Sequence, residues 1–520
     1  MFAAVYGMSV IGLQAHLIRV EVDVANGLPS FDIVGLATTA VREARDRVRS
    51  AIRNSGYQFP LQRVTVNLAP ADLRKEGSGL DLPIAIGILA ATEQCLCQTF
   101  DQYVFSGELS LEGTLRPVPG VLTMAIALDR ENNKLELAGV RAAESRCLII
   151  PEDNLAEARL VTGLETHCIT TLQQVKQILE KKSDFEDKMS SPFPKSKIYN
   201  SSQVDWSDIH GQQHVKRALE IAASGGHNVV LVGPPGSGKT LLAKAYSGIL
   251  PQLSEQESIE VTQLYSVCGL LNWNGSLVRQ RPFRSPHHTI TKVGMIGGGR
   301  DLRPGELSLA NYGVLFLDEL PEFSREVLEC LRQPLEDREL TITRQSGSIT
   351  YPAHVSVIAS MNPCPCGFFG DQGRACHCTP LQIKNYRGRI SGPLLDRFDM
   401  HIEVPRLSYT ELKTSYDTAP SGVVRERVMA TRCRQWARLG PSKTNAEMSA
   451  KETKEFGKLT PSGESILRRI FDSQHLSARA HDRILRVART IADLEGSSDI
   501  HPEHLAEAIQ FRALDKRLQI

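Results

Sequence analysis

The spacing of apolar residues changes along the chain and separates regions of different architecture. Apolar residues alternate with polar ones in stretches such as RVTVNLAP at 63–70, which predicts strands. They recur at helical spacing in stretches such as VREARDRVRSAI at 41–52. The pattern predicts an α/β fold with an α+β domain, a polar linker containing two prolines, a second α/β domain and a helical C-terminal domain. These regions are residues 1–180, 181–203, 204–405 and 406–520.

The composition excludes several classes of protein. The chain has 520 residues, of which 41% are hydrophobic and 23% charged, as in ordinary globular proteins. It contains no run of about 18 apolar residues, so we expect no membrane span. The N-terminus lacks the pattern of a signal peptide, so we expect a cytoplasmic protein whose 11 cysteines stay reduced. A net charge of +1 still permits DNA binding, because positive charge can be confined to one groove or pore.

The strongest motif is a glycine-rich loop between an apolar strand and a helix, in NVVLVGPPGSGKTLLAKAYSGIL at 228–250. Glycines let backbone N–H groups turn toward phosphates, and a helix N-terminus favours negative charge. Lys239 is expected to reach the β- and γ-phosphates of ATP, and Thr240 to bind Mg²⁺. The loop residues predicted to bind the nucleotide are Gly233, Pro234, Pro235, Gly236, Ser237, Gly238, Lys239 and Thr240.

Two further strands are expected to end at residues that act on ATP. GVLFLDEL at 313–320 ends in Asp318, expected to hold nucleotide-bound Mg²⁺, and Glu319, expected to activate the attacking water. The alternative is a buried strand with a solvated acidic end. Asn362 follows the apolar run VSVIASM and is expected to orient the water, although an ordinary turn asparagine would fit the same pattern.

Two arginines are candidates for stabilising the negative charge of the transition state. Arg397 precedes the strand-like end of GPLLDRFDMHIEV, at 392–404, and is expected to be an arginine finger. If a neighbouring subunit supplies it, hydrolysis depends on ring assembly. Arg479 begins the helical stretch 478–494 and is expected to sense the γ-phosphate from the lid. The alternative for each arginine is a surface ion pair.

The order of these motifs resembles the AAA+ ATPases of the magnesium-chelatase-like branch. Stretches that carry the resemblance are RPFRSPHHTI at 281–290, LRQPLEDRELTITR at 331–344 and ASMNPCPCG at 359–367. With its N-terminal region, the whole chain resembles the competence protein ComM (YifB) family. The resemblance implies an AAA+ P-loop core with a helical lid, preceded by a Lon-protease-like α+β domain. It also implies an ATP-driven homohexameric DNA helicase for branch migration in natural transformation, with single-stranded, duplex or branched DNA and recombination proteins as partners.

The N-terminal domain departs from the Lon pattern at the catalytic positions. RKEGSGLDLPIAIGIL at 74–89 has Gly79 where the Lon family has its serine, and Ser78 is one residue away. The stretch 117–128, where the lysine is expected, contains none. A serine nucleophile needs a base within hydrogen-bond reach. We therefore expect a non-proteolytic scaffold used for assembly or DNA contact.

Two basic loops are candidate DNA contacts. The stretch 287–308 carries Lys292, Arg300 and Arg303, and the hairpin pattern at 339–355 carries Arg344 near its turn. Such residues can grip phosphates without reading bases. Alternatively, the loops pack between subunits or address a protein partner, as in a chelatase-like ATPase that remodels a partner for metal insertion. A third basic stretch, RERVMATRCRQWAR, fits either DNA contact or a solvated helix face.

Four of the cysteines lie close together in NPCPCGFFGDQGRACHCTP at 362–380. Four thiolates on a short loop suit tetrahedral Zn²⁺, and we expect a structural clip that keeps Asn362 and the strand after Arg397 in register. His377 could replace one cysteine, and four free thiols are the alternative. The predicted zinc ligands are Cys364, Cys366, Cys376 and Cys378.

Overall fold

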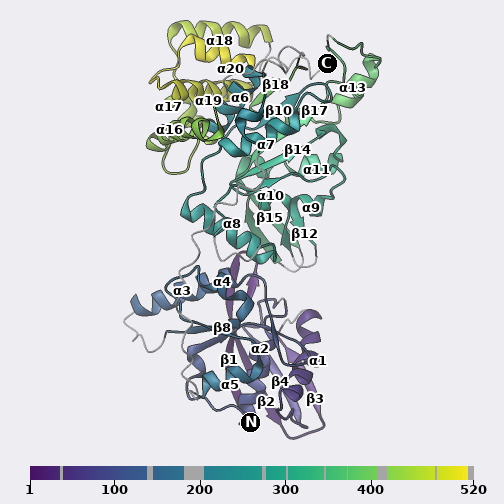
Figure 1. Cartoon of the computed structure of the whole chain (residues 1–520), viewed down its shortest axis with the longest axis vertical. Helices are drawn as coiled ribbons and strands as arrows, with labels where there is room; N and C mark the ends of the chain where they lie inside the picture. The colour runs from purple at the N-terminus through teal and green to yellow at the C-terminus, as the bar shows by residue number, and fades with distance from the viewer. Residues whose placement is uncertain are drawn as a thin grey trace.

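The protein forms two lobes joined end to end, with the helical C-terminal part at the far end of the second lobe (Figure 1). The mixed α/β architecture that the sequence predicts is present, and the second lobe contains a parallel sheet. No described helix is long and apolar enough to cross a membrane. The computed structural model describes residues 1–35, 39–75, 77–137, 145–180, 204–271, 277–299, 302–344, 347–371, 373–407, 419–474 and 477–512.

The N-terminal lobe is built on a seven-stranded mixed sheet in the order β3-β4-β2-β1-β5-β8-β9. Along β2, buried positions alternate with more exposed ones, whereas every residue of β8 is buried. Helix α2 is buried along nearly its whole length against β1 and β2. The elements are β1 (Phe2–Ile11), β2 (Gln14–Ala25), β3 (Ser30–Val34), α1 (Thr39–Asn54), β4 (Arg63–Ala69), α2 (Asp81–Ala91), β5 (Tyr103–Phe105), β6 (Glu108–Leu109), β7 (Leu115–Arg116), α3 (Val121–Leu137), β8 (Cys147–Pro151), α4 (Leu155–Ala158), β9 (Thr166–Ile169) and α5 (Leu172–Leu179).

The second lobe contains a five-stranded sheet in the order β11-β14-β17-β10-β18, in which every neighbouring pair is parallel. Because the strands are parallel, their carboxyl ends meet at one edge, where ligands bind in open α/β sheets. The elements are α6 (Gln213–Gly225), β10 (Val229–Val232), α7 (Lys239–Ile249), α8 (Glu255–Val267), β11 (Phe283–Arg284), α9 (Lys292–Ile296), β12 (Gly297–Gly298), β13 (Arg303–Pro304), α10 (Glu306–Leu309), β14 (Val314–Leu317), α11 (Arg325–Cys330), α12 (Pro334–Asp337), β15 (Glu339–Arg344), β16 (Gly347–Pro352), β17 (Ser356–Met361), α13 (Pro380–Arg387), α14 (Gly392–Leu395) and β18 (Met400–Glu403).

Four C-terminal helices, α16, α18, α19 and α20, share one hydrophobic core with α6 and α7 of the sheet domain. Ile484, Ala488 and Ile491 lie in this core, as their spacing predicts. The helices are α16 (Ser421–Leu439), α17 (Ala450–Phe456), α18 (Pro461–Gln474), α19 (Ala478–Glu495) and α20 (Pro502–Gln510).

The arginines of α16 have a structural role that neither sequence-based interpretation of this stretch anticipates. Arg425 donates to the carbonyl of Gly248, and buried Arg432 donates to that of Ala223. Arg438 forms an ion pair with Asp493 on α19. Arg425 and Arg432 therefore attach the bundle to the sheet domain, and Arg438 joins two helices of the bundle.

The two lobes meet through α3 and α8 and through two hairpins. Buried Glu157 accepts a hydrogen bond from the Ser266 hydroxyl at the end of α8. At the tip of the β1–β2 hairpin, Leu13 packs on the hydrophobic cluster that includes Leu340 and Tyr351 of the β15–β16 hairpin. The N-terminal lobe therefore braces the hairpin that carries Arg344.

Candidate nucleotide-binding site

The phosphate loop follows β10 at the carboxyl edge of the parallel sheet. Gly233 begins it, and a Cβ there would lie 2.2 Å from the Val404 carbonyl oxygen, so only glycine fits. Gly236 and Gly238 have φ of 77° and 86°, and an added Cβ would meet no atom within 4 Å at either position. The loop thus opens on free space at the N-terminus of α7, which is the geometry that binds phosphate.

Lys239, the first residue of α7, turns back over the loop. Its Nζ donates to the carbonyls of Gly233 (2.8 Å) and Pro234 (2.9 Å) and lies 3.3 Å from Oδ1 of Asn362. Burial lowers the pKa of the ammonium group, while the charges of Asp318 and Glu319 oppose that shift. The structure therefore brings the loop lysine together with the asparagine that follows β17.

Thr240 and Asp318 face each other across the site. The Thr240 hydroxyl donates to Oδ2 of Asp318 at 3.1 Å, and the Ser360 hydroxyl donates to Oδ1 of the same carboxylate. Hydroxyl and carboxylate oxygens are the hard ligands that Mg²⁺ prefers, so these residues fit the ion that accompanies ATP. The sequence analysis did not single out Ser360, one of two serines in the mostly apolar stretch VSVIASM at 355–361.

Glu319 has an unusual backbone. Its φ of 54° and ψ of 50° are left-handed, which is uncommon for a residue other than glycine and often marks a functional position. Its N–H donates to Oδ1 of Asp318 at 3.1 Å, while its side chain is exposed. Nδ1 of His288 lies 3.9 Å from its Oε2. The sequence analysis did not single out His288, which reaches the site from the segment after β11.

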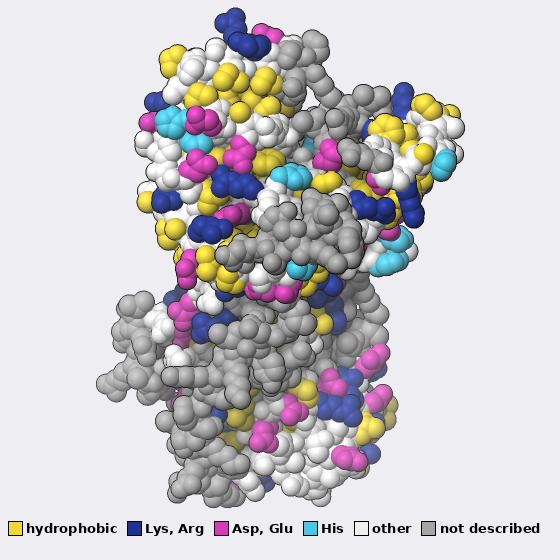
Figure 2. All heavy atoms as spheres, turned by 45° about the horizontal axis from the view of Figure 1, so that its top comes forward, with side chains coloured by type: hydrophobic (Ala, Val, Ile, Leu, Met, Phe, Trp, Pro, Cys, Tyr) yellow, Lys and Arg dark blue, Asp and Glu magenta, His cyan; other side chains and the backbone are white. Residues whose placement is uncertain are grey.

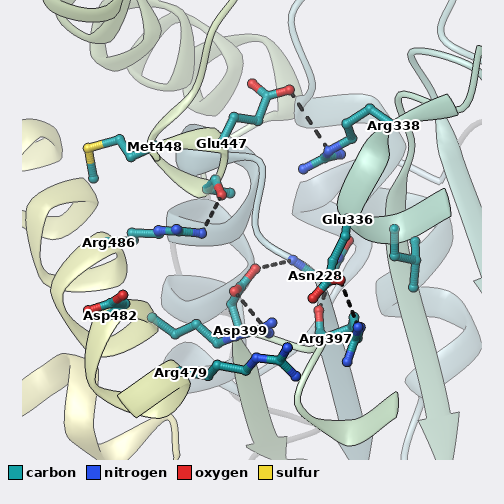
Figure 3. A pocket seen from close by; sticks show the side chains of 13 residues that line it. Asn228, Glu336, Arg338, Arg397, Asp399, Glu447, Met448, Arg479, Asp482 and Arg486 are labelled. Atoms are coloured by element: carbon teal, nitrogen blue, oxygen red, sulfur yellow. Dashed lines mark hydrogen bonds and ion pairs between the residues drawn. The ribbon is translucent and has the colours of Figure 1, made fainter. Parts of the chain in front are cut away.

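Arg397 and Arg479 lie at the other edge of the sheet. Both line a cavity of about 400 Å³ between the sheet domain and α19, together with Asn228 and Asp399 (Figure 3). Asn228 precedes β10 and the phosphate loop follows it, so the length of the strand, about 15 Å, separates the cavity from that loop. Neither arginine lies beside the phosphate loop of its own chain.

The two arginines of this cavity are held differently. Arg397 is mostly buried, pairs with Glu336 at 2.8 Å and donates to the Pro393 carbonyl at 2.7 Å, whereas Arg479 is exposed. Asp399 links two segments of the cavity wall, because its carboxylate accepts a hydrogen bond from the Asn228 N–H at 3.0 Å. Burial opposes its ionisation, but a hydrogen bond from His227 and the charge of Arg483 hold the pKa of Asp399 below its usual range.

The structure brings together two of the basic loops. Arg344 is exposed at the end of β15, and a Cβ on Gly298 of β12 would lie 3.8 Å from its Nη2. Gly298 pairs with exposed Arg303 on β13, so both arginines belong to one surface. Lys292 is partly engaged, with its Nζ 3.6 Å from Glu326, and Arg300 lies outside the described residues. On the face seen in Figure 2, basic and acidic side chains are intermixed.

The four cysteines predicted to bind zinc converge. Their Sγ atoms all lie within 4.8 Å of one another, and Cys364 is buried. His377 is not part of this group.

The Lon-like positions of the N-terminal lobe lie at the start of α2. A Cβ on Gly79 would lie 3.0 Å from the Ser106 hydroxyl, and the Ser78 hydroxyl donates to Glu108. Lys75 is buried and donates to the Pro70 carbonyl.

Comparison with known proteins agrees with this architecture. Residues 205–412 match the family model of magnesium chelatase, subunit ChlI, and residues 20–138 match that of subunit ChlI of Mg-chelatase. Residues 418–512 match that of the ChlI C-terminal domain. The chain is 44% identical over 515 residues to the uncharacterized protein YifB of Escherichia coli, covering 99% of this chain and 97% of that protein. It is 43% identical over 525 residues to competence protein ComM of Haemophilus influenzae, covering 99% and 98%.

The chain belongs to the ComM/YifB family. This family is magnesium-chelatase-like, and its sheet and helical domains are those of an AAA+ ATPase. A more distant relative is the magnesium-chelatase 38 kDa subunit of Rhodobacter capsulatus, 23% identical over 346 residues, which are 60% of this chain and 87% of that subunit.

Proposed function

We propose that this protein is an ATP-driven DNA motor that assembles as a homohexamer and promotes branch migration when incoming DNA is recombined. The observation that carries the proposal is the single surface formed by Arg344 and Arg303, on the same domain as the phosphate loop, Thr240 and Asp318. Similarity over nearly the whole chain to a protein named for competence supports the choice of DNA as the substrate.

ATP hydrolysis would use the residues at the carboxyl edge. The phosphate loop and Lys239 bind the phosphates, and Thr240 with Asp318 would hold Mg²⁺, which neutralises phosphate charge when bound. Glu319 accepts a proton from the attacking water, and Asn362 orients that water. The position of Asn362 beside Lys239, 3.3 Å away, supports this role.

Arg397 and Arg479 would act on the nucleotide of a neighbouring subunit. Their location at the opposite end of β10 from their own phosphate loop supports that assignment, because an arginine side chain cannot span the strand. Hydrolysis would then require the ring, and the Arg397–Glu336 pair must open when the neighbour docks.

A short segment of the chain connects the proposed DNA-binding surface to Glu319, the proposed catalytic base. His288 lies 3.9 Å from Glu319, and four residues later Lys292 begins α9, which leads into the loop of Gly298 and Arg303. A phosphate backbone bound by that loop would displace this segment and with it His288. Stimulation of the ATPase by DNA is the expected consequence.

The N-terminal lobe would serve as a scaffold in this motor. It braces the β15–β16 hairpin through Leu13, which supports a role in setting the position of Arg344. The residue at the Lon serine position is glycine, and the neighbouring Ser78 donates to a carboxylate, so a serine protease is disfavoured.

The second candidate is a chelatase-like ATPase that remodels a protein partner for metal insertion, which the matches to the ChlI models favour. The deciding experiment measures ATPase rate with and without branched DNA, and branch migration on the same preparation. We expect DNA to raise the ATPase rate and ATP to drive migration, with Glu319→Gln protein as the inactive control. A wild type that hydrolyses ATP but neither binds nor moves any DNA would favour the chelatase-like function.

A further inference from the structure

The cysteine cluster has the dimensions of a single metal site. The Sγ of Cys364 lies 3.3 Å from that of Cys366 and 3.7 Å from that of Cys376, and the latter two are 3.6 Å apart. A tetrahedral zinc ion with metal–sulfur bonds of about 2.3 Å separates its sulfurs by about 3.8 Å. The observed separations are far longer than a disulfide bond of about 2.05 Å. The Sγ of Cys378 belongs to the same group, in which all four Sγ atoms lie within 4.8 Å of one another, and four thiols grouped in this way favour an ion at their centre.

The same loop touches the phosphate loop. Gly367, one residue after Cys366, has a φ of 85°, and a Cβ there would lie 2.5 Å from Cδ of Pro235. Asn362, two residues before Cys364, lies 3.3 Å from Lys239 through its Oδ1. The cysteine loop thus meets the nucleotide site at two points, one on each side of Cys364.

The flanks of the loop are well anchored. Arg387 on α13 donates to the Pro363 carbonyl at 3.1 Å, and its guanidinium lies 5.2 Å from the centre of the Phe369 ring. Thr379 caps α13 directly after Cys378. Between these anchors the described residues, 364–371 and 373–378, form no helix or strand, so a bond through the cysteines would constrain the shape of the loop.

We propose that Cys364, Cys366, Cys376 and Cys378 bind one zinc ion, and that this ion holds Gly367 against Pro235 and thereby sets the affinity of the phosphate loop for nucleotide. Soft thiolates select zinc over magnesium, and zinc has no redox chemistry, so it suits a permanent cross-link. The inference rests on the nucleotide site of the proposed function and needs no DNA.

Metal content is the first test. Protein purified without chelator should contain about one zinc ion per chain by mass spectrometry. The double variant Cys376→Ser/Cys378→Ser should lose it, while Cys433→Ser, which removes an exposed cysteine on α16, should keep it. Absence of zinc from the wild type, or another metal such as iron in its place, would overturn the site.

A pair of glycine variants tests the link to the nucleotide. Gly367→Ala keeps every cysteine but forces the added methyl group against Pro235. Gly370→Ala is the matched control, because Gly370 lies in the same loop with a φ of 81° and an added Cβ there meets no atom within 4 Å. Both variants should retain zinc. Gly367→Ala should bind a fluorescent ATP analogue roughly tenfold more weakly, a change of about 1.4 kcal/mol, and Gly370→Ala should bind it like the wild type.

Each outcome has a clear meaning. Equal nucleotide affinity of the two glycine variants would refute the link, even if zinc is present. Chelation of the wild type should weaken analogue binding and added zinc should restore it, and unchanged affinity after complete zinc removal would also refute the link. All these measurements omit DNA, so a failure of the DNA motor hypothesis would leave them unaffected.

Discussion

Arg397 and Arg479 line the same cavity, although one precedes β18 of the sheet domain and the other begins α19 of the C-terminal bundle (Figure 3). The helical domain therefore does not cover the phosphate loop of its own chain with Arg479. It presents Arg479 beside Arg397 at the amino edge of the sheet. Both arginines of this cavity therefore lie apart from the phosphate loop of their own chain.

The Glu319 carboxylate is predicted to be the base for ATP hydrolysis. Glu319→Gln should keep nucleotide binding, because Thr240 and Asp318 remain paired, and should lower kcat by roughly a hundredfold or more. Lys239→Ala should instead weaken nucleotide binding. The control is Glu464→Gln, an exposed carboxylate on α18. Hydrolysis by Glu319→Gln at the wild-type rate would show that another group is the base.

Arg397 is predicted to act across a subunit interface. Arg397→Ala should bind ATP and DNA but hydrolyse ATP roughly a hundredfold more slowly. Mixing it with Glu319→Gln protein should restore part of the activity, since some interfaces then combine an intact Glu319 with an intact Arg397. The exposed Arg469→Ala on α18 serves as the control for removing one arginine. No recovery in mixed rings shown to form would exclude action in trans.

Arg479 should behave like Arg397 in the same mixing experiment. Because both line one cavity away from their own phosphate loop, Arg479→Ala protein should also regain activity when mixed with Glu319→Gln protein. An arginine that senses the γ-phosphate of its own chain would give no such recovery, since the intact Glu319 and the defect would share one site. Measuring the ATPase rate across mixing ratios distinguishes action on a neighbouring subunit from action within the same chain.

Arg344 is predicted to contact the DNA backbone. Arg344→Ala should keep basal ATPase and ring assembly, because the hairpin lies away from the nucleotide site, but should lose DNA stimulation and branch migration. Its DNA affinity should depend less steeply on salt concentration. The slope of log affinity against log salt concentration should fall by about one unit per lost phosphate contact. The control is Arg468→Ala, which removes an exposed arginine on α18. Equal slopes and equal migration would remove Arg344 from the mechanism.

Glu447 is predicted to stabilise the junction between the sheet domain and the helical bundle in a pH-dependent manner. Burial opposes its ionisation, but His354, Arg338 and Thr444 together lower its pKa from 4.5 to about 2. A lowered pKa means that the stabilisation, of order 2–3 kcal/mol, is complete above pH 4.5 and is lost as the pH falls toward 2.

The thermal midpoint of Glu447→Gln should therefore lie below that of the wild type at pH 5.5, and by a smaller margin at pH 3.5. Glu455→Gln, an exposed carboxylate on α17, should show little difference at any of these pH values. A margin that stays constant down to pH 3.5 would contradict the role of the ionised carboxylate.

The sequence by itself determined the nucleotide site and the order of its parts. A glycine-rich loop between an apolar strand and a helix has only one common geometry, because backbone conformation at glycines is a local property. Asp318, Glu319 and Asn362 could be predicted to meet the loop because each follows an apolar strand, and parallel strands end at the same edge. The cysteine group could be predicted equally well, since its four members lie within one short loop.

Only the tertiary structure decided which distant segments touch. Ser360 reaches Asp318 from β17, and His288 approaches Glu319 from the segment after β11. Leu13 packs on a hairpin more than three hundred residues later in the chain, and arginines of α16 bind carbonyls of neighbouring helices. The shared cavity of Arg397 and Arg479 depends on how α19 docks on the sheet domain. Such contacts follow from the packing of whole helices and strands against one another. The number of residues between two side chains in the sequence does not tell how close packing brings them.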